Sequence, residues 1–193
     1  MKPFKICIDA GHYGKYNHSP AVDDYYESDM NWKLHLMLKE ELEKYGAQVI
    51  TTRENQETDK PLFERGAMSE GCDLFLSIHS NAVGDDVNED VDYPISIVQL
   101  HGKGDELGLK IAKCVAELMG TRQEGTIKNR RGENGEYYGV LRGAAAVNTL
   151  GIIIEHSFHT NTRSTLWLLN DDNLKKTAKA EAKLIAEYFG LIS

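Results

Sequence analysis

The chain has 193 residues, which is enough for one sizeable hydrophobic core and suits a single domain. Its 22 Lys and Arg against 30 Asp and Glu give a formal net charge of −8, which argues against nucleic acid as the main partner, because binding to a phosphate backbone depends on clustered cations. No apolar stretch approaches the roughly 20 residues of a membrane-spanning helix. We expect no signal peptide, because a predicted strand begins already at Phe4. We therefore expect synthesis in the cytoplasm.

The first half of the chain alternates between strand-like and helix-like patterns. Apolar runs rich in Ile, Leu and Phe predict buried strands at 4–9, 47–52 and 73–79. Apolar residues that recur every three or four positions predict a helix over 28–45, and a proline suited to the first helical turn predicts another over 61–70. This alternation is typical of an α/β sheet whose strands are connected through helices.

The same alternation continues toward the carboxyl end. Strands are predicted at 95–100 and 150–155, and a helix with an amphipathic pattern at 103–119. The glycine-rich segment 121–136 predicts a loop.

A last amphipathic helix is predicted to begin with Asp171 or Asp172 as its N-cap residue. Strands that alternate with helices need apolar cover on both faces of the sheet. We therefore expect an α/β fold of one domain, with a twisted, mostly parallel or mixed sheet and helices on both faces.

Two of the predicted strands end at a histidine. His12 follows the strand 4–9, His79 ends the strand 73–79, and Glu27 lies between them in the sequence. Carboxyl ends of parallel strands meet at one edge of a sheet, where sites are usually built. Two His and one carboxylate are a ligand set for zinc that leaves a position open for water. Taken singly, a His beside Gly is more often a turn residue, and Glu27 alone is explained by the dipole at a helix start.

A third strand ends at Glu155. The three preceding residues, 152–154, are isoleucines and predict a fully buried strand. A carboxylate directly after such a strand needs a partner, because an uncompensated buried charge is expensive. Glu155 is therefore a candidate for acid–base chemistry near the two histidines.

Four segments resemble, in order, the motifs of the zinc-dependent N-acetylmuramoyl-L-alanine amidases of bacterial autolysins, spore-cortex hydrolases and phage endolysins. The resemblance covers nearly the whole chain. It rests on Asp9-Ala10-Gly11-His12, Tyr26-Glu27-Ser28-Asp29-Met30-Asn31, Ser77-Ile78-His79-Ser80-Asn81-Ala82, and Tyr138-Gly139-Val140-Leu141-Arg142 followed by Ile154-Glu155-His156-Ser157-Phe158-His159-Thr160-Asn161. Any one motif is weak evidence, but four in order at this spacing are a strong signal. The segment between His12 and Glu27 is rich in Tyr and departs from the family pattern.

The resemblance implies an enzyme that hydrolyses the amide bond between N-acetylmuramic acid and L-alanine in peptidoglycan, with 1–193 as its catalytic domain. It implies a Zn²⁺ ion held by His12, Glu27 and His79. Glu155 is expected to take a proton from water and then pass one to the leaving nitrogen, a role that the chemistry of an amide also requires.

Asn81 and Arg142 each permit two interpretations, and three further polar residues are assigned one role each. Asn81 either hydrogen-bonds substrate or holds a turn, and Arg142 either holds a carboxylate of the stem peptide or pairs with a buried acid. His156 and His159 are candidates to support the site through hydrogen bonds. Arg65 is expected to form a structural ion pair.

Two other functions remain open on the sequence alone. A zinc carboxypeptidase or related peptidase uses a similar set of residues, but tends to place its first His and Glu close together. A non-catalytic wall-binding module of the same fold is the alternative outside enzymes, although Glu155 and the three ligands are all intact. We also expect action at the cell wall after release or export, and a possible wall-binding domain fused beyond Ser193, because a charge of −8 disfavours tight contact with a polyanionic wall.

Overall fold

Successive apolar side chains along each central strand point to opposite faces of the sheet. The computed structural model describes residues 3–133 and 135–192. Six strands form one sheet in the order β2-β1-β3-β8-β4-β5. They are β1 (Lys5–Ala10), β2 (Gln48–Thr51), β3 (Leu74–Asn81), β4 (Ile95–Val98), β5 (Thr126–Lys128) and β8 (Leu150–Phe158).

The sheet is mixed. Strand β1 pairs in parallel with β2 and β3, and β3 pairs in parallel with β8. Strand β4 runs antiparallel to β8 and parallel to β5. The expectation of a mostly parallel or mixed sheet is confirmed, and the carboxyl ends of β1, β3 and β8 lie side by side.

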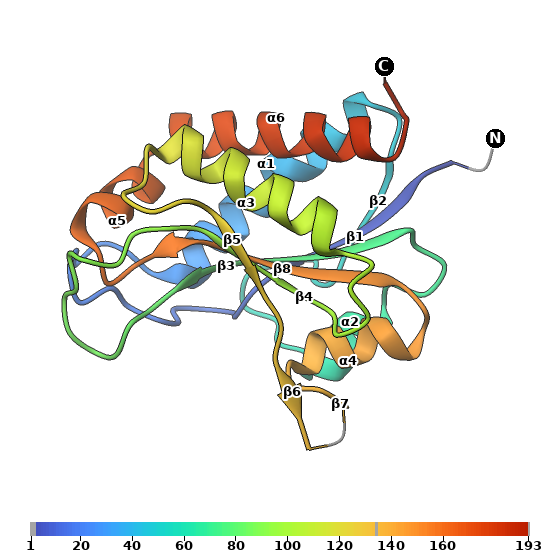
Figure 1. Cartoon of the computed structure of the whole chain (residues 1–193), viewed down its shortest axis with the longest axis horizontal. Helices are drawn as coiled ribbons and strands as arrows, with labels where there is room; N and C mark the ends of the chain where they lie inside the picture. The colour runs from blue at the N-terminus through green and yellow to red at the C-terminus, as the bar shows by residue number, and fades with distance from the viewer. Residues whose placement is uncertain (1–2, 134, 193) are drawn as a thin grey trace.

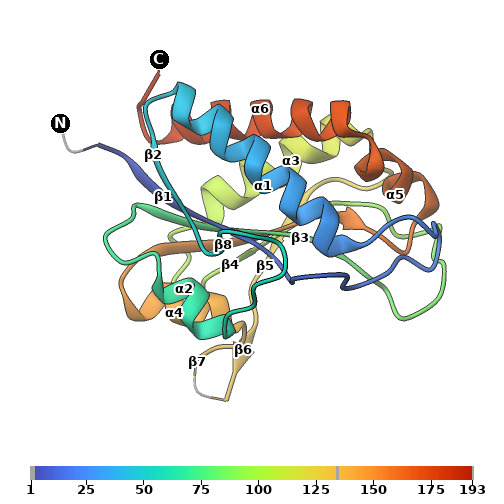
Figure 2. The same cartoon turned by 180° about the vertical axis from the view of Figure 1, so that it is seen from behind.

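Two layers of helices cover the two faces (Figures 1 and 2). Helices α1 (Glu27–Lys44), α3 (Asp105–Met119) and α6 (Asp171–Tyr188) pack on one face, and α2 (Leu62–Ala67) and α4 (Gly139–Ala146) pack together on the other. Helix α5 (Thr162–Leu169) follows β8. Among the described residues, no helix combines the length and apolar character needed to cross a lipid bilayer.

The pleat of each strand decides which layer a side chain meets. Ile6 and Ile8 belong to the larger core under α1, α3 and α6, whereas Cys7 between them belongs to the smaller core under α4. In β3, Leu74 and Leu76 face the larger core and Phe75 the smaller one. Because successive side chains alternate, Asp9, Ser77 and His79 share the face that α2 and α4 cover.

Several boundaries differ from the sequence prediction. The predicted loop 121–136 contains β5 and a short hairpin formed by β6 (Arg131–Gly132) and β7 (Gly135–Glu136). Helix α4 was not predicted, because it has only eight residues and two of them are glycines, which are poor helix formers. The N-cap of α6 is Asn170 rather than Asp171 or Asp172, since the Asn170 side chain accepts hydrogen bonds from the first-turn backbone amides.

Candidate active site

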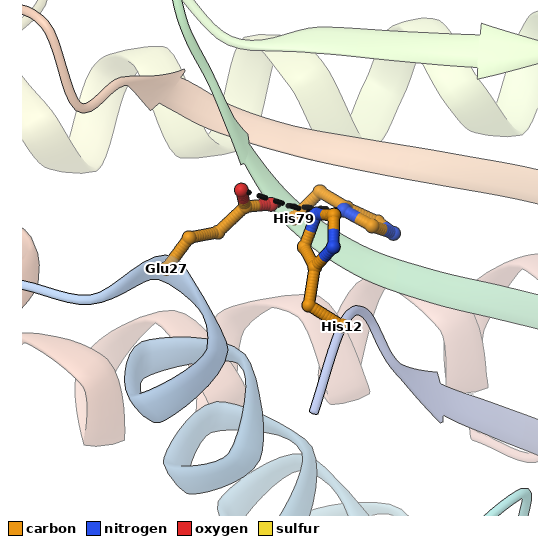
Figure 3. A group of neighbouring side chains, drawn as sticks. All are labelled: His12, Glu27 and His79. Atoms are coloured by element: carbon orange, nitrogen blue, oxygen red, sulfur yellow. Dashed lines mark hydrogen bonds and ion pairs between the residues drawn. The ribbon is translucent and has the colours of Figure 1, made fainter. Parts of the chain in front are cut away.

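Three potential metal ligands meet at the carboxyl edge of the sheet (Figure 3). His12 comes just after β1, Glu27 is the first residue of α1, and His79 lies near the end of β3. One ligand atom from each lies within 4.8 Å of the others. The structure therefore brings together the three residues that the sequence nominated.

His12 adopts a backbone conformation that is unusual for a residue with a side chain. Its φ is 60°, in the left-handed region, which costs energy for a residue other than Gly or Asn. Tyr16 stacks on the imidazole with ring centroids 4.7 Å apart. In this conformation Nε2 of His12 lies 3.2 Å from Oε2 of Glu27.

His79 faces the same carboxylate through Nδ1, whereas His12 faces it through Nε2. Nδ1 of His79 lies 2.9 Å from Oε1 of Glu27, and Nε2 lies 3.1 Å from the hydroxyl of Ser77. Gly11 packs directly against the ring, since a Cβ added at Gly11 would lie 2.2 Å from Cε1 of His79. The imidazole is thus held on one face by backbone and at both nitrogens by polar atoms.

Glu27 is almost fully buried, with 1% of its surface exposed. Its Oε1 accepts hydrogen bonds from the Ser80 amide at 3.1 Å and from Asn31 at 3.4 Å, and its Oε2 accepts one from Asn17 at 2.5 Å. Burial alone would raise the pKa of Glu27, but hydrogen bonds from the two histidines hold this pKa well below its ordinary value. Glu27 is therefore anionic and oriented toward both imidazoles.

The donor set fits a divalent cation. His12 and His79 each direct a ring nitrogen at an oxygen of Glu27. Because a lone pair on the nitrogen and one on the oxygen repel each other, a proton or a cation must lie between the two atoms. Two imidazoles and one carboxylate are borderline ligands that suit zinc among the common metals. The three residues form a candidate metal site.

Glu155 stands directly across from His79 in the sheet register. It is half-buried, and its Oε2 is shielded from solvent without a hydrogen-bond partner among the residues that the structure describes. Burial, followed by the charge of Glu27, raises the pKa of Glu155 well above its ordinary value. An unpartnered buried carboxyl beside a metal-ligand group is typical of a functional site.

A cavity of about 530 Å³ joins these groups. His12, His79 and Glu155 line its polar side. Its other wall is largely apolar and comes from the tyrosine-rich segment after β1 and from the α2–α4 layer. The lining side chains on that wall are Tyr13, Tyr16, Leu62, Tyr138 and Val140.

Asn81 and Arg142 lie outside the residues that line this cavity. The Asn81 side chain accepts a hydrogen bond from the next backbone amide, at Ala82. Nη1 of Arg142 donates to the backbone carbonyls of Glu136 and Tyr137 at 3.1 and 2.6 Å. The contact of Asn81 matches the interpretation in which it holds a turn, whereas Arg142 contacts two backbone carbonyls rather than the carboxyl of a buried acid. A role in substrate binding stays a prediction for both.

The two histidines after Glu155 are buried supports rather than members of the ligand group. His156 contacts the carbonyl of His79 through Nδ1 at 3.1 Å and the carboxylate of Glu181 in α6 through Nε2 at 2.9 Å. Nδ1 of His159 lies 3.0 Å from the hydroxyl of Ser80. Both therefore support the backbone at and just after His79, a candidate ligand.

Sequence reasoning missed three polar residues that touch the site. Asn17 contacts both Glu27 and His12, and Asp9 and Ser77 lie behind His79. The period-2 spacing of Ser77 and His79 could have found the serine, because it places both side chains on one face of β3. Arg65 forms the expected ion pairs, with Asp59 at 2.5 Å and with Asp9 at 3.7 Å.

Comparison with known proteins identifies relatives over nearly the whole chain. A family model described as N-acetylmuramoyl-L-alanine amidase matches residues 6–187. The N-acetylmuramoyl-L-alanine amidase from Clostridium difficile 630 is 22% identical, with a TM-score of 0.83 and 98% of both chains covered. The catalytic domain of CwlV from Bacillus (Paenibacillus) polymyxa var. colistinus is 19% identical, with a TM-score of 0.76 and coverage of 98% of this chain and 99% of that one.

A third similar structure belongs to a much longer protein. Cwp6 from Clostridium difficile is 25% identical with a TM-score of 0.79, and the match covers 96% of this chain but 29% of that one. The two preceding structures establish likeness of fold alone at their level of identity. No curated protein sequence matches the chain.

Proposed function

This chain belongs to the N-acetylmuramoyl-L-alanine amidase family, and we propose that it cuts its peptidoglycan substrate with a zinc ion held by His12, Glu27 and His79 and with Glu155 as the acid–base residue. The bond is the amide between N-acetylmuramic acid and the L-alanine of the stem peptide. One observation carries the proposal: the unpartnered carboxyl of Glu155 lines a single cavity with His12 and His79, the two histidines of the three-ligand group.

An amide is a weak electrophile with a strongly basic leaving nitrogen. When bound, zinc supplies a Lewis acid that polarises the carbonyl and makes a water molecule more acidic. Glu155 takes the proton of the attacking water and returns one to the departing alanine nitrogen. A pKa raised by burial suits this double task, because the carboxyl must both accept and release a proton near neutral pH.

The residues around the proposed ligands orient them. The Ser80 amide and Asn31 fix one oxygen of Glu27, while Asn17 contacts the other. Tyr16 stacks on the imidazole of His12. Such supports keep ligand atoms within the small tolerance that catalysis allows.

Family membership resolves the alternatives that the sequence left open. A carboxypeptidase-type peptidase is disfavoured, because the family model for amidases spans residues 6–187. A non-catalytic module is disfavoured by the intact ligand group and by Glu155, whose orphaned oxygen has no structural explanation among the described residues.

The test separates binding of metal from chemistry. We expect Glu155→Gln to retain zinc and to lose about 10²–10⁴-fold in rate, because only the proton-transfer group is removed. Zinc content is measured by elemental analysis. Products released from purified peptidoglycan are measured by mass spectrometry, which should detect new L-alanine amino termini and no new reducing sugar ends.

Glu136→Gln is the matched control, because Glu136 also has a buried oxygen without a partner among the described residues but does not line the cavity. Its rate should stay close to that of the unaltered protein. Near-normal turnover by Glu155→Gln, or reducing ends as the main product, contradicts the proposal.

The substrate also bears on where the protein acts. We propose action at the cell wall after release or export, since peptidoglycan lies outside the cytoplasmic membrane. A wall-binding domain fused beyond Ser193 would lie outside the described residues, and it stays a prediction. Sedimentation with intact cell walls tests the weak wall affinity expected for a chain of charge −8.

A further inference from the structure

Asp9 is a buried carboxylate near the ligand group that the proposed mechanism does not use. It lies near the end of β1 and is fully buried. Oδ2 accepts a hydrogen bond from Ser77 at 2.7 Å, and Oδ1 accepts one from Thr52 at 2.6 Å. Nη1 of Arg65 lies 3.7 Å from Oδ1. These partners explain how a carboxylate is tolerated in the core, but not why one is placed there.

Ser77 connects this carboxylate to a candidate metal ligand. Its hydroxyl donates its only proton to Asp9, so at its second contact the hydroxyl oxygen can only accept. That second contact is Nε2 of His79, at 3.1 Å. Nε2 must therefore be the nitrogen that carries a proton.

A proton on Nε2 determines whether Nδ1 of the same ring can bind a metal. In the neutral imidazole, Nδ1 then has a free lone pair. Nδ1 of His79 is the nitrogen that faces Glu27, at 2.9 Å. The ring cannot tilt away easily, because the backbone of Gly11 packs against it and an added Cβ there would lie 2.2 Å from Cε1.

We propose that Asp9 and Ser77 act as a positioning relay for His79. Asp9 fixes the direction of the Ser77 hydroxyl, the hydroxyl fixes the His79 proton on Nε2, and Nδ1 is thereby presented to the metal. The proposal deepens the proposed function and rests on it for one point, that His79 is a ligand. Metal-binding histidines commonly donate their second N–H to a carboxylate, carbonyl or water; here a serine hydroxyl stands between imidazole and carboxylate.

A purely structural role for Asp9 makes different predictions. Asp9 also joins β1 to Thr52, just after β2, and to Arg65 in α2, so it could serve as a pin between elements. Loss of a pin lowers the free energy of unfolding, but leaves the tautomer and the metal affinity of the folded protein unchanged. Loss of the relay changes both.

The sharpest comparison is Ser77→Val against Ser77→Thr. The two side chains have nearly the same shape and differ by the hydroxyl, so both disturb packing equally and only Thr keeps the hydrogen bonds. We expect Ser77→Val to bind zinc about 10–100-fold more weakly and Ser77→Thr to stay within about threefold of the unaltered protein. Asp9→Asn should lie between them, because an amide oxygen is a weaker acceptor than a carboxylate.

Two measurements are made on each folded variant. Zinc affinity is determined by competition with a chromophoric chelator. The nitrogen of His79 that carries the proton is determined from imidazole ¹⁵N shifts of the zinc-loaded protein, in which the metal takes the place of a proton between Nδ1 and Glu27. We expect the Nε2–H form in the unaltered protein and in Ser77→Thr, and a mixture of tautomers in Ser77→Val. Thr52→Val is the control, because it removes the other hydroxyl from Asp9 and should change neither readout.

The outcomes distinguish the relay from the proposed function. Equal zinc affinity and an unchanged tautomer in Ser77→Val overturn the relay, and an Asp9→Asn variant that matches the unaltered protein removes Asp9 from it. If Ser77→Val does not fold, Ser77→Ala makes the same comparison with a smaller side chain. The tautomer is read by NMR and not from turnover, so it tests the relay even if the activity assay of Glu155→Gln contradicts the catalytic assignment.

Discussion

Gly11→Ala tests the placement of His79 through a single added methyl group. The φ of Gly11 lies outside the left-handed region, so alanine is compatible with the local backbone. The added Cβ would lie 2.2 Å from Cε1 and 2.3 Å from Nε2 of His79, whereas ordinary contact begins near 3.4 Å. The imidazole must therefore retreat by about 1.2 Å, the difference between these distances.

A retreat of that size exceeds the roughly 0.5 Å within which a catalytic constellation must be held. It breaks the 3.1 Å contact of Nε2 with Ser77 and the 2.9 Å contact of Nδ1 with Glu27. We expect weaker zinc binding, a rate lower by about 100-fold, and a loss of about 1–3 kcal/mol in the free energy of unfolding from overpacking. The effect on the site should thus exceed the effect on the fold.

The assay measures zinc affinity, peptidoglycan hydrolysis at saturating zinc, and urea unfolding. Gly104→Ala is the control, because a Cβ at Gly104 would meet its nearest neighbours at 3.5 Å, an ordinary contact distance. Near-normal affinity and rate in Gly11→Ala, within about threefold, would show that His79 does not sit against Gly11 as described.

Two further predictions concern buried histidines. Burial is the main cause that lowers the pKa of His35 from 6.5 to about 4, so the folded protein resists a proton that the unfolded chain accepts. The free energy of unfolding should therefore fall as the pH decreases from about 6.5 toward 4, by up to about 3 kcal/mol. Urea unfolding of the unaltered protein and of His35→Gln at several pH values measures this loss. Identical pH dependence in both proteins contradicts the attribution of the loss to His35. Glu181→Ala should lower the free energy of unfolding by about 3–5 kcal/mol by leaving His156 without its carboxylate. Glu181→Gln should lower it less, because its amide can still hydrogen-bond the ring. Equal losses of stability in the two variants, measured by thermal and urea unfolding, refute this.

The main layers of the fold could be predicted because long elements carry strong periodic signals. The run Ile152 to Ile154 and the amphipathic pattern of α6 each favour one structure clearly. The strands β5, β6 and β7 are two or three residues long and lie among glycines, so local sequence carries no comparable signal. Their pairing depends on tertiary context.

The ligand group could be nominated because strand ends converge whatever their separation in sequence. His12 and His79 each follow an apolar run, and Glu27 opens a helix. The supports of the site escape such reasoning, since Asp9 and Ser77 look like ordinary polar interruptions of buried strands. Their meaning depends on which strand lies beside which, and that is set by the pairing of β1 with β3.

The strand order has a consequence for the timing of activity during synthesis. All three candidate ligands are encoded within the first 79 residues, in the segment from β1 to β3. Glu155 arrives much later, on β8, which must enter the sheet between β3 and β4 after both have been made. A nascent or truncated chain that stops before β8 can carry the candidate ligands but lacks Glu155, the proposed acid–base residue. Under the proposed mechanism, insertion of β8 is therefore the step that makes the folded chain catalytically competent.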